Sequence, residues 1–384
     1  MSSAQPPNPQ QRSTWYAKGL ARAAVFFGVA ALVAAVAAAY GIARDYGYLH
    51  ASILSGSPGG YYHALASRLA ERAKRGNGTL AVISTEGSIE NIYRLKNGRG
   101  HCDEMFGLIQ DGTPVPAAAN ITLLGRLPEL ESLLLLGRRG NSFHSFVDLR
   151  GASIGIGPRE SGTAYLMQQL FDDPDLRQLD LHFSYHELPE QAELVGQGKL
   201  DLAAFVMKED AELLRTIVRQ YDLDIVSPID LNGLVARYPW LGLGTIAAGR
   251  YDLVRLTPSA DKPVAHLATL VVAGPCALRA DRIALLVLLT AELPGFVRNN
   301  PPGATSSATD VSLAPEASQF FRNGQPALAD QYFPWLVNVL SPAYWIYLVM
   351  AVTVLFNGMS LYSRFRLWRI DAVREKLEAR LTIR

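Results

Sequence analysis

The sequence predicts an α/β body of two lobes flanked by two transmembrane helices. Short apolar runs are followed three times by a glycine-rich turn and a helical pattern, which is typical of α/β proteins with mostly parallel sheets. Two uncharged stretches near the ends of the 384-residue chain are long enough to cross a membrane. Between them lie about 295 residues, more than one hydrophobic core usually serves, so two lobes are expected.

The first uncharged stretch covers residues 23–43, with the sequence AAVFFGVAALVAAVAAAYGIA. Its 21 residues exceed the roughly 7–15 apolar residues of a secretory leader, and Tyr40 interrupts the small residues that a cleavage site prefers. The pattern therefore favours an uncleaved transmembrane signal anchor, preceded by a cytoplasmic segment at 1–22. A cleavable leader is the alternative.

The second uncharged stretch covers residues 342–363 and predicts a second transmembrane helix. Tyr344, Trp345 and Tyr347 lie at one end, as in the aromatic belt of a membrane interface, and Arg364 begins a basic run at the other. A buried core helix is the alternative. Such a helix is seldom apolar all round with so abrupt a basic edge, so the spanning helix is favoured.

The charges divide between the ends and the middle of the chain. Residues 1–44 carry four basic side chains and no acid, and residues 364–384 carry seven basic and three acidic ones. Of the 36 basic and 35 acidic residues in the whole chain, this leaves 25 and 32 for the middle, a net charge of −7. An acidic body of this kind would repel phosphate, which excludes a generally basic nucleic-acid binder.

The basic flanks also predict a topology. Because basic flanks stay on the cytoplasmic side, both termini are expected there, with the body at 45–340 on the periplasmic side of a bacterial inner membrane. The tail at 364–384 has apolar residues near helical spacing and is expected to lie on membrane lipid. Within the body we expect lobe 1 at about 48–145 and 245–340, and lobe 2 at about 146–244.

Three turns carry the functional signal. Apolar runs at 51–54, 80–83 and 153–156 each lead through a small-residue turn into a helical pattern, while 200–206 and 268–273 read as further strands and 299–308 as a loop. Each helix start offers unpaired backbone N–H groups and the positive end of a helix dipole. Three such starts facing one cleft would bind a carboxylate or phosphate, although one alone is more often an ordinary cap.

The three turns resemble a known family. The segments SGSPGGYYHALASRLAERAKRGNG, ISTEGSIENIYRLKNG and GIGPRESGTAYLMQQLF are similar to those of the TAXI family, the solute-binding subunits of TRAP-type secondary transporters. The segment APEASQFFRNGQPALADQYFPWLVNVL, followed by a span and a basic tail, resembles a membrane-anchored branch of that family. The resemblance implies a two-lobed, type II periplasmic-binding-protein-like body. It also implies a small carboxylate ligand, amino-acid-like or dicarboxylic, and a TRAP membrane permease subunit as partner.

The resemblance further implies ligand-binding residues at the turns. They are Ser57, Gly60 and Tyr62 in the first turn, Thr85, Gly87, Ser88 and Asn91 in the second, Gln110 and Asp111 after a strand, and Ser161, Gly162 and Thr163 in the other lobe. Glu86 departs from the pattern, because a small residue is usual at this position of the Thr-x-Gly-Ser motif. An added carboxylate beside the site would weaken anion binding unless it points outward.

Neither catalysis nor a metal or cofactor site is indicated. Ser161 follows a strand, but Arg159 stands where the nucleophile elbow of a hydrolase requires glycine. Glu160 takes the third-glycine position of a dinucleotide fingerprint and would oppose a pyrophosphate. Metal-binding residue types occur consecutively at 101–104, but neighbours on a strand do not share one face.

The chain has two cysteines, Cys102 and Cys276, which excludes a four-cysteine zinc or iron–sulfur site. An oxidising compartment would permit a disulfide between them, but the sequence does not reveal how far apart they lie.

The combined interpretation is an extracytoplasmic receptor that hands a small carboxylate to a separate transport subunit, because two helices are too few to form a carrier. The alternative is a membrane-anchored sensor or assembly factor that uses the same binding fold, which the double anchor favours.

Overall fold

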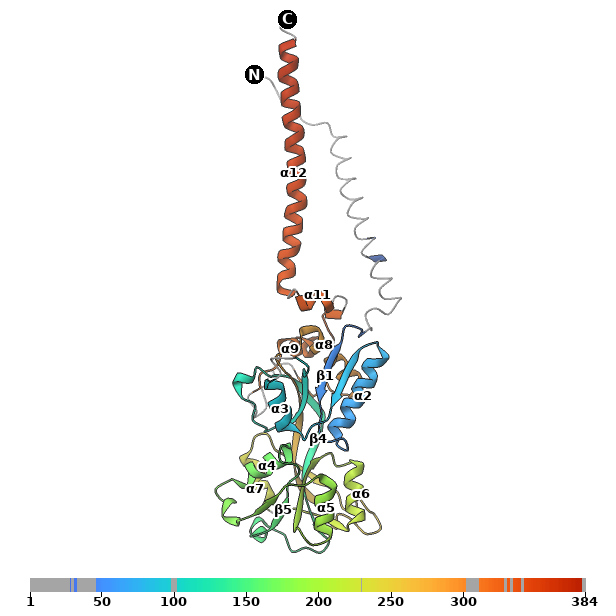
Figure 1. The fold of residues 1–384 in the computed structure, drawn as a ribbon, viewed down its shortest axis with the longest axis vertical. Helices are drawn as coiled ribbons and strands as arrows, with labels where there is room; N and C mark the ends of the chain where they lie inside the picture. The colour runs from blue at the N-terminus through green and yellow to red at the C-terminus, as the bar shows by residue number, and fades with distance from the viewer. Residues whose placement is uncertain are drawn as a thin grey trace. The chain divides into compact units, whose positions relative to one another are not determined.

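The computed structural model describes residues 46–97, 102–228, 230–301 and 311–327, then 330–331, 334–339 and 342–381, and residues 28, 31 and 32 near the N-terminus. The chain divides into two compact units, Met1–Ala327 and Leu328–Arg384. The first unit contains the α/β body, and the second contains helices α11 and α12 (Figure 1).

The body is one mixed sheet covered by helices (Figure 1). Its strands are β1 His50–Leu54, β2 Thr79–Ile83, β3 Phe106–Gln110, β4 Thr122–Arg138, β5 Ser153–Gly155, β6 His182–Ser184, β7 Leu202–Met207, β8 Leu223–Val226, β9 Gly242–Ile246 and β10 Lys262–Ala273. Its helices are α2 Tyr61–Arg75, α3 Ser88–Asn97, α4 Gly162–Phe171, α5 Leu188–Gly196, α6 Glu212–Gln220, α7 Leu231–Arg237, α8 Arg279–Glu292 and α9 Pro315–Asn323, with 3-10 turns at Ala117–Ala119, Phe146–Leu149 and Arg177–Leu179. The strands predicted near 51, 80, 153, 200 and 268 are all present.

The sheet order is β2-β1-β3-β10-β4-β7-β5-β6, with β8 beside β4 and β9 beside β10. β1 pairs in parallel with β2 and β3, and β5 with β6 and β7. The long strands β4 and β10 run antiparallel to each other and to their remaining partners. The prediction of mostly parallel pairing therefore holds at the two sides of the sheet and is wrong in the middle, where the chain crosses between the lobes.

Strands β4 and β10 are shared by both lobes (Figure 1). On β4, Leu127 packs into the core with β1 to β3, whereas Leu134 packs with β7 and β8. On β10, Leu267 packs into a core of lobe 2 and Leu270 into a core of lobe 1, and the pairing with β4 contains a bulge between them. The lobes therefore meet within these strands. Lobe 2 takes in about 130–267, rather than the expected 146–244.

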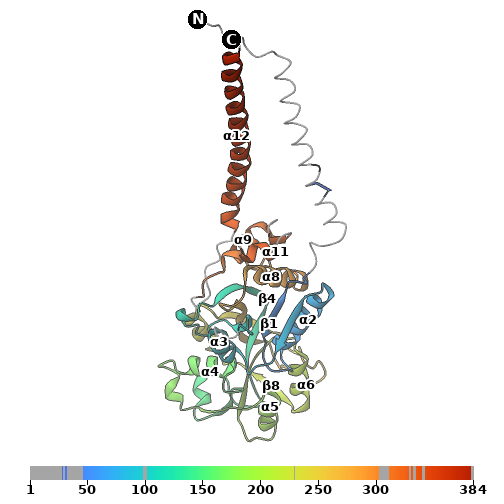
Figure 2. The same cartoon turned by 45° about the horizontal axis from the view of Figure 1, so that its top comes forward.

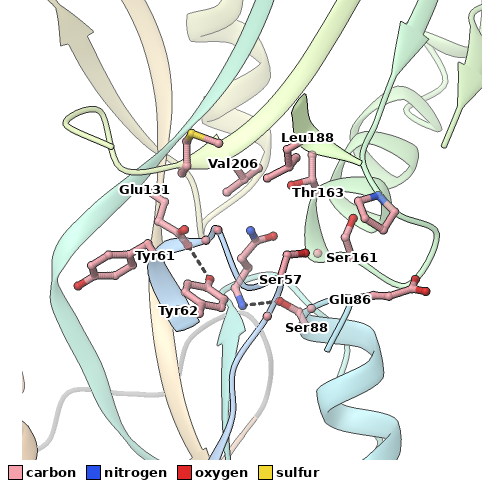
Figure 3. Close-up of a pocket in the computed structure, with 18 of the residues that line it drawn as sticks. Ser57, Tyr61, Tyr62, Glu86, Ser88, Glu131, Ser161, Thr163, Leu188 and Val206 are labelled. Atoms are coloured by element: carbon pink, nitrogen blue, oxygen red, sulfur yellow. Dashed lines mark hydrogen bonds between the residues drawn. The ribbon is translucent and has the colours of Figure 1, made fainter. Parts of the chain in front are cut away.

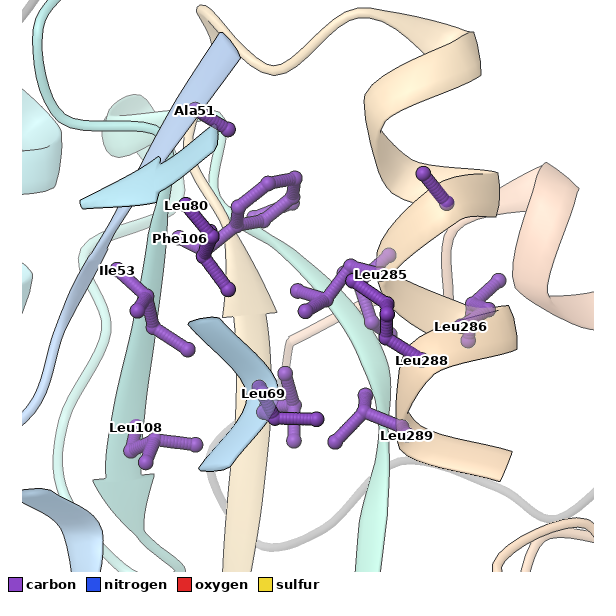
Figure 4. Packing of buried hydrophobic residues seen from close by; sticks show 14 of the residues in the cluster. Ala51, Ile53, Leu69, Leu80, Phe106, Leu108, Leu285, Leu286, Leu288 and Leu289 are labelled. Atoms are coloured by element: carbon purple, nitrogen blue, oxygen red, sulfur yellow. The ribbon is translucent and has the colours of Figure 1, made fainter. Parts of the chain in front are cut away.

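Lobe 1 has its main core between the sheet and helices α2 and α8. Ile53, Leu69, Phe106, Leu285 and Leu289 are fully buried there, and Figure 4 shows side chains of the strands facing those of the helices. Burying each such side chain stabilises the fold by about 2 kcal/mol before conformational entropy is subtracted. In lobe 2, helices α4, α5 and α6 pack around β5, β7 and β8 (Figure 2).

A disulfide joins Cys102 to Cys276, with a Cα–Cα distance of 5.3 Å. Cys102 precedes β3 and Cys276 follows β10, and these two strands are neighbours in the sheet. The question that the sequence left open is thus answered by the sheet order. Both cysteines lie in lobe 1, and the segment of chain between them contains all of lobe 2.

The second unit contains α11 (Pro334–Val339) and α12 (Pro342–Leu381). Helix α12 runs without a break through the stretch predicted to cross the membrane and into the predicted tail. Large apolar side chains along it are exposed, among them Tyr347, Val354, Trp368 and Leu377. A hydropathy search over the described helices finds none that is both long and apolar enough to cross a membrane. The first predicted span lies outside the described residues except for Gly28, Ala31 and Leu32.

Candidate functional site

A cavity of about 90 Å³ lies between the lobes, beside the part of β4 that pairs with β10 and passes from one lobe to the other. Both lobes line it, and Figure 3 shows the side chains that face it. Nine of the twelve predicted ligand-binding residues belong to its lining: Ser57, Gly60, Tyr62, Gly87, Ser88, Gln110, Ser161, Gly162 and Thr163. The structure therefore brings the three predicted turns together, while their role in binding remains a prediction.

The first turn connects β1 to α2. Gly60 is the N-cap of α2 and has no side chain that could cap the helix, so the N–H groups of the first turn lack a capping side chain. Gly60, Tyr61 and Tyr62, at this helix start, all belong to the cavity lining. The N–H of Gly60 itself donates to the Ser57 carbonyl at 2.8 Å, which holds the turn closed. The first helix start is thus positioned by backbone bonding and leaves space for a ligand.

The second turn connects β2 to α3. Gly87 has φ +141°, a conformation that side-chain-bearing residues rarely adopt, and a Cβ placed there would lie 3.2 Å from Cα of Ser161. Ser88 follows at the helix start, and its Oγ accepts a hydrogen bond from the backbone N–H of Gln110 at 3.0 Å. Glycine at position 87 is therefore favoured by its backbone conformation and by the close approach of the two lobes.

The third turn connects β5 to α4 in lobe 2. Ser161 is the N-cap, and its Oγ accepts a hydrogen bond from the N–H of Ala164 at 3.1 Å. A Cβ on Gly162 would lie 2.2 Å from Oε1 of Gln110 and 2.7 Å from Oγ of Ser88, both in lobe 1. The structure thus represents a closed cleft, in which α4 begins directly against lobe 1.

Gln110 is the most informative of the predicted residues. Its side chain is 5% exposed and lines the cavity, yet its Oε1 has no hydrogen-bond partner among the residues that the structure describes. A buried amide oxygen without a partner costs about 1–3 kcal/mol, so the position favours a bound molecule that donates to it.

Three predicted residues, Thr85, Asn91 and Asp111, do not line the cavity. Asn91 is fully buried, and its amide donates to the carbonyls of Ser55 at 3.0 Å and Leu108 at 2.7 Å, while Thr85 donates to Oδ1 of Asn91. Asp111 accepts from the N–H of Gly112 at 2.9 Å. In the closed cleft these side chains hold the loops that carry the lining residues.

Glu131 is a lining residue that the sequence reading missed. It is 2% exposed, and its carboxylate accepts hydrogen bonds from the hydroxyls of Tyr62 at 2.6 Å and Thr269 at 2.9 Å. Burial raises its pKa to about 7, although those bonds and the charge of Lys208 oppose the rise. The available signal was an acidic residue inside a long strand that is otherwise mostly apolar, although Glu129 on the same strand carries the same signal without lining the cavity.

Glu86 bridges the lobes at the edge of the cavity. Its carboxylate accepts a hydrogen bond from the backbone N–H of Glu160 at 3.0 Å, just before the start of α4. The residue that departs from the family pattern therefore ties the second turn to the third.

A charged cluster borders the cavity on the Tyr61 side. The Tyr61 hydroxyl donates to Glu129 at 2.8 Å, and Nζ of Lys208 lies 2.7 Å from Glu129 and 4.8 Å from the centre of the Tyr61 ring. Burial would raise the pKa of Glu129, but the hydrogen bonds from Lys208 and Tyr61 together lower it. Lys208 is thus neutralised outside the cavity.

Two of the four residues first considered as metal ligands are engaged elsewhere, and residue 101 lies outside the described part of the chain. Cys102 is in the disulfide, and Glu104 pairs with Arg94. In the part of the chain that the structure describes, no group of three or more His, Cys, Asp or Glu side chains is placed to hold a metal ion.

The raised pKa of Glu131 predicts a pH dependence of stability. Because its folded pKa of about 7 lies above the ordinary 4.5, the folded state binds more protons than the unfolded state between these values. The free energy of unfolding should therefore fall as pH rises from 5 to 8, by up to about 3 kcal/mol from this group. Glu131→Gln should remove that fall in urea denaturation of the full chain, and Glu129→Gln should leave it in place. Equal pH dependence in wild type and Glu131→Gln would contradict the assignment.

More than half of the chain is similar to a known protein family. A model of the NMT1-like family matches residues 53–273, more than half of the 384-residue chain. The chain belongs to the NMT1-like family. The match begins in β1 and ends with β10, so the part shared by NMT1-like proteins contains lobe 2, all three turns and the strands of lobe 1, but not helices α8 and α9. A search of curated proteins finds no match to this NMT1-like chain.

Solved structures with a similar fold come from several kinds of protein. One is the substrate-binding protein of an amino acid ABC transporter, with 10% identity, 74% of this chain and 100% of that chain covered, and a TM-score of 0.39. Another is the CcmR regulatory domain of Synechocystis PCC6803 in complex with 2-PG, with 12% identity, 64% of this chain and 97% of that chain covered, and a TM-score of 0.41. A third comes from work on glutathione import via GshT and TcyBC of Streptococcus mutans, with 14% identity, 64% of this chain and 88% of that chain covered, and a TM-score of 0.38. At these scores the similarities carry no argument about the ligand of the NMT1-like chain.

Proposed function

We propose that the protein is an extracytoplasmic solute receptor, whose lobes close on a small carboxylate. The observation that carries this proposal is the meeting of three helix starts on one cavity between the lobes. Their free N–H groups and dipoles would replace the water around a carboxylate without a cationic side chain. The closed arrangement would then remove the bound group from solvent.

We further propose that the receptor is the solute-binding subunit of a TRAP-type transporter of the TAXI kind. The support is the resemblance of its three turns and of its C-terminal FRNG and YFPW segments to that family. In this proposal a separate permease subunit receives the ligand. A gene for such a permease beside this one would support transport, whereas a kinase or cyclase gene would favour the alternative role as a sensor.

The proposed location is the bacterial inner membrane, with the body in the periplasm and both termini in the cytoplasm. The support is the two uncharged stretches with their basic flanks. The disulfide between Cys102 and Cys276 is the kind of bond that persists in an oxidising compartment. Labelling of cysteines introduced into the termini, with a membrane-impermeant reagent on intact cells, would test this topology.

Binding can be tested by calorimetry on the full chain with a panel of amino acids and dicarboxylic acids. We expect at least one of them to bind. The double variant Ser88→Ala with Thr163→Ala should weaken that binding by about ten- to a hundredfold, because each hydroxyl contributes about 1 kcal/mol when it is hydrogen-bonded. Replacing the exposed hydroxyls of Thr216 and Ser312 by alanine should leave the affinity unchanged. Unchanged affinity in the first variant would place the site elsewhere.

A further inference from the structure

We propose that Glu131 selects the charge of the ligand, so that the bound molecule is a small zwitterion whose amine faces Glu131 and whose carboxylate lies at the helix starts. This inference rests on the proposed receptor function and deepens it. A dicarboxylate, which the turns alone would accept equally well, is excluded by the same residue.

The first argument is the geometry of the Glu131 carboxylate. Both of its hydrogen bonds, from Tyr62 and from Thr269, end on Oε2. Within the described part of the chain, no hydrogen bond ends on Oε1, and the residue lines the cavity. The tyrosine and threonine hydroxyls thus hold the side chain in place from α2 and β10. One carboxylate oxygen is left for a donor inside the cavity.

The second argument is the charge of the lining. Glu86 and Glu131 are its ionisable acids, and none of the described lining residues is lysine, arginine or histidine. Lys208, the cation that acts on Glu131 from the end of β7, is already held by Glu129 at 2.7 Å and Asp210 at 3.5 Å. A ligand with two negative charges would meet two acids without a compensating cation. A ligand amine would supply that cation.

The third argument is the separation of the two kinds of group across the cavity. Figure 3 shows Glu131 and Tyr61 on one side of the pocket, and Ser161 and Thr163 on the other. The start of α4 thus lies across the cavity from the Glu131 carboxylate, so a ligand with an anionic and a cationic end could contact both. The second side also holds acceptors. The Glu86 carboxylate there is already bonded to the N–H of Glu160, and Oε1 of Gln110, which has no hydrogen-bond partner among the described residues, lies against Gly162.

The decisive experiment compares ligands that differ only in the amine: L-glutamate with glutarate, and L-leucine with 4-methylpentanoate. Calorimetry is done on the full chain at pH 7. We expect the amine-bearing member of at least one pair to bind wild type at least tenfold more tightly than its partner. Glu131→Gln should remove this preference. Glu129→Gln, a change of the same kind on the same strand but outside the cavity lining, should keep it.

A second measurement uses wild type alone and so does not depend on the folding of a variant. Titration of the amine-bearing ligand in buffers of different ionisation enthalpy reports the protons exchanged on binding. A nearby ammonium group stabilises the ionised carboxylate, so binding near pH 7 should release part of a proton from Glu131. An anionic ligand would cause proton uptake instead.

The outcomes separate the two proposals. Tight binding of glutarate or 4-methylpentanoate with proton uptake, or an amine preference that survives in Glu131→Gln, would overturn the role of Glu131 and leave the receptor function standing. Absence of binding by all four compounds and by the wider panel would overturn both.

Discussion

Replacing Gly87 by alanine should weaken ligand binding at least tenfold. Two effects add at this position. An L-residue is strained at φ +141°, and its Cβ would come within 3.2 Å of Cα of Ser161 and 3.4 Å of the backbone nitrogen of Gly162 in the opposite lobe. These are backbone atoms, so the contact cannot be relieved by a change of rotamer. Overpacking of this kind typically costs about 1–3 kcal/mol, and here it falls on the closed form of the cleft.

The measurement does not require the ligand to be known in advance. Hydrogen exchange of the peptide containing 158–164 should become faster in Gly87→Ala, because the third turn loses its contact with lobe 1. Gly151→Ala is the matched control: its φ is +70° and no heavy atom lies within 4 Å of its added Cβ, so it tests backbone strain without the lobe contact. Equal exchange in the two variants would show that Gly87 does not govern closure.

Removal of the disulfide should cause the largest loss of stability. The bond between Cys102 and Cys276 spans 174 residues. Closing a loop of that length lowers the entropy of the unfolded chain, by an amount equivalent to about 5 kcal/mol in the chain-entropy description. The double variant Cys102→Ser with Cys276→Ser should therefore unfold at a markedly lower urea concentration than wild type.

Reduction provides the control for this prediction. A reducing agent should lower the urea midpoint of wild type and leave that of the double serine variant unchanged. A wild type that is insensitive to reductant would mean that the cysteines are not bonded in solution. Lobe 2 contributes no residue to the disulfide. On reduction, the rate of backbone hydrogen exchange in β7 should therefore rise less than the rate in β3.

The parts of the site that sequence could predict are those fixed by local structure. The turns before α2, α3 and α4 are each encoded by small residues between a strand and a helix, and nine of the predicted residues line the cavity. Thr85, Asn91 and Asp111 belong to the same segments but point into the loops that support them. Local patterns locate a turn, but they do not distinguish its cavity-facing side chains from its supporting ones.

The features that sequence missed depend on how distant strands are ordered. Glu131 becomes a lining residue because β4 crosses from one lobe to the other at that point, beside β10. The boundary between lobes falls inside these strands for the same reason. The pairing of Cys102 with Cys276 likewise follows from the adjacency of β3 and β10. None of these relations is visible in a window of neighbouring residues.

The bulge in β10 lies between Ala268 and Leu270, at the residue that donates to Glu131. When two lobes rotate about strands that they share, groups on those strands move least and groups at the far turns move most. In such a rotation Glu131 would keep its place in the open and the closed cleft, whereas Ser161 and its helix start would reach the cavity only on closure. A ligand that enters the open cleft would meet the stationary carboxylate first, and its anionic end would be captured afterwards. The amine would then be recognised before the lobes close on the ligand.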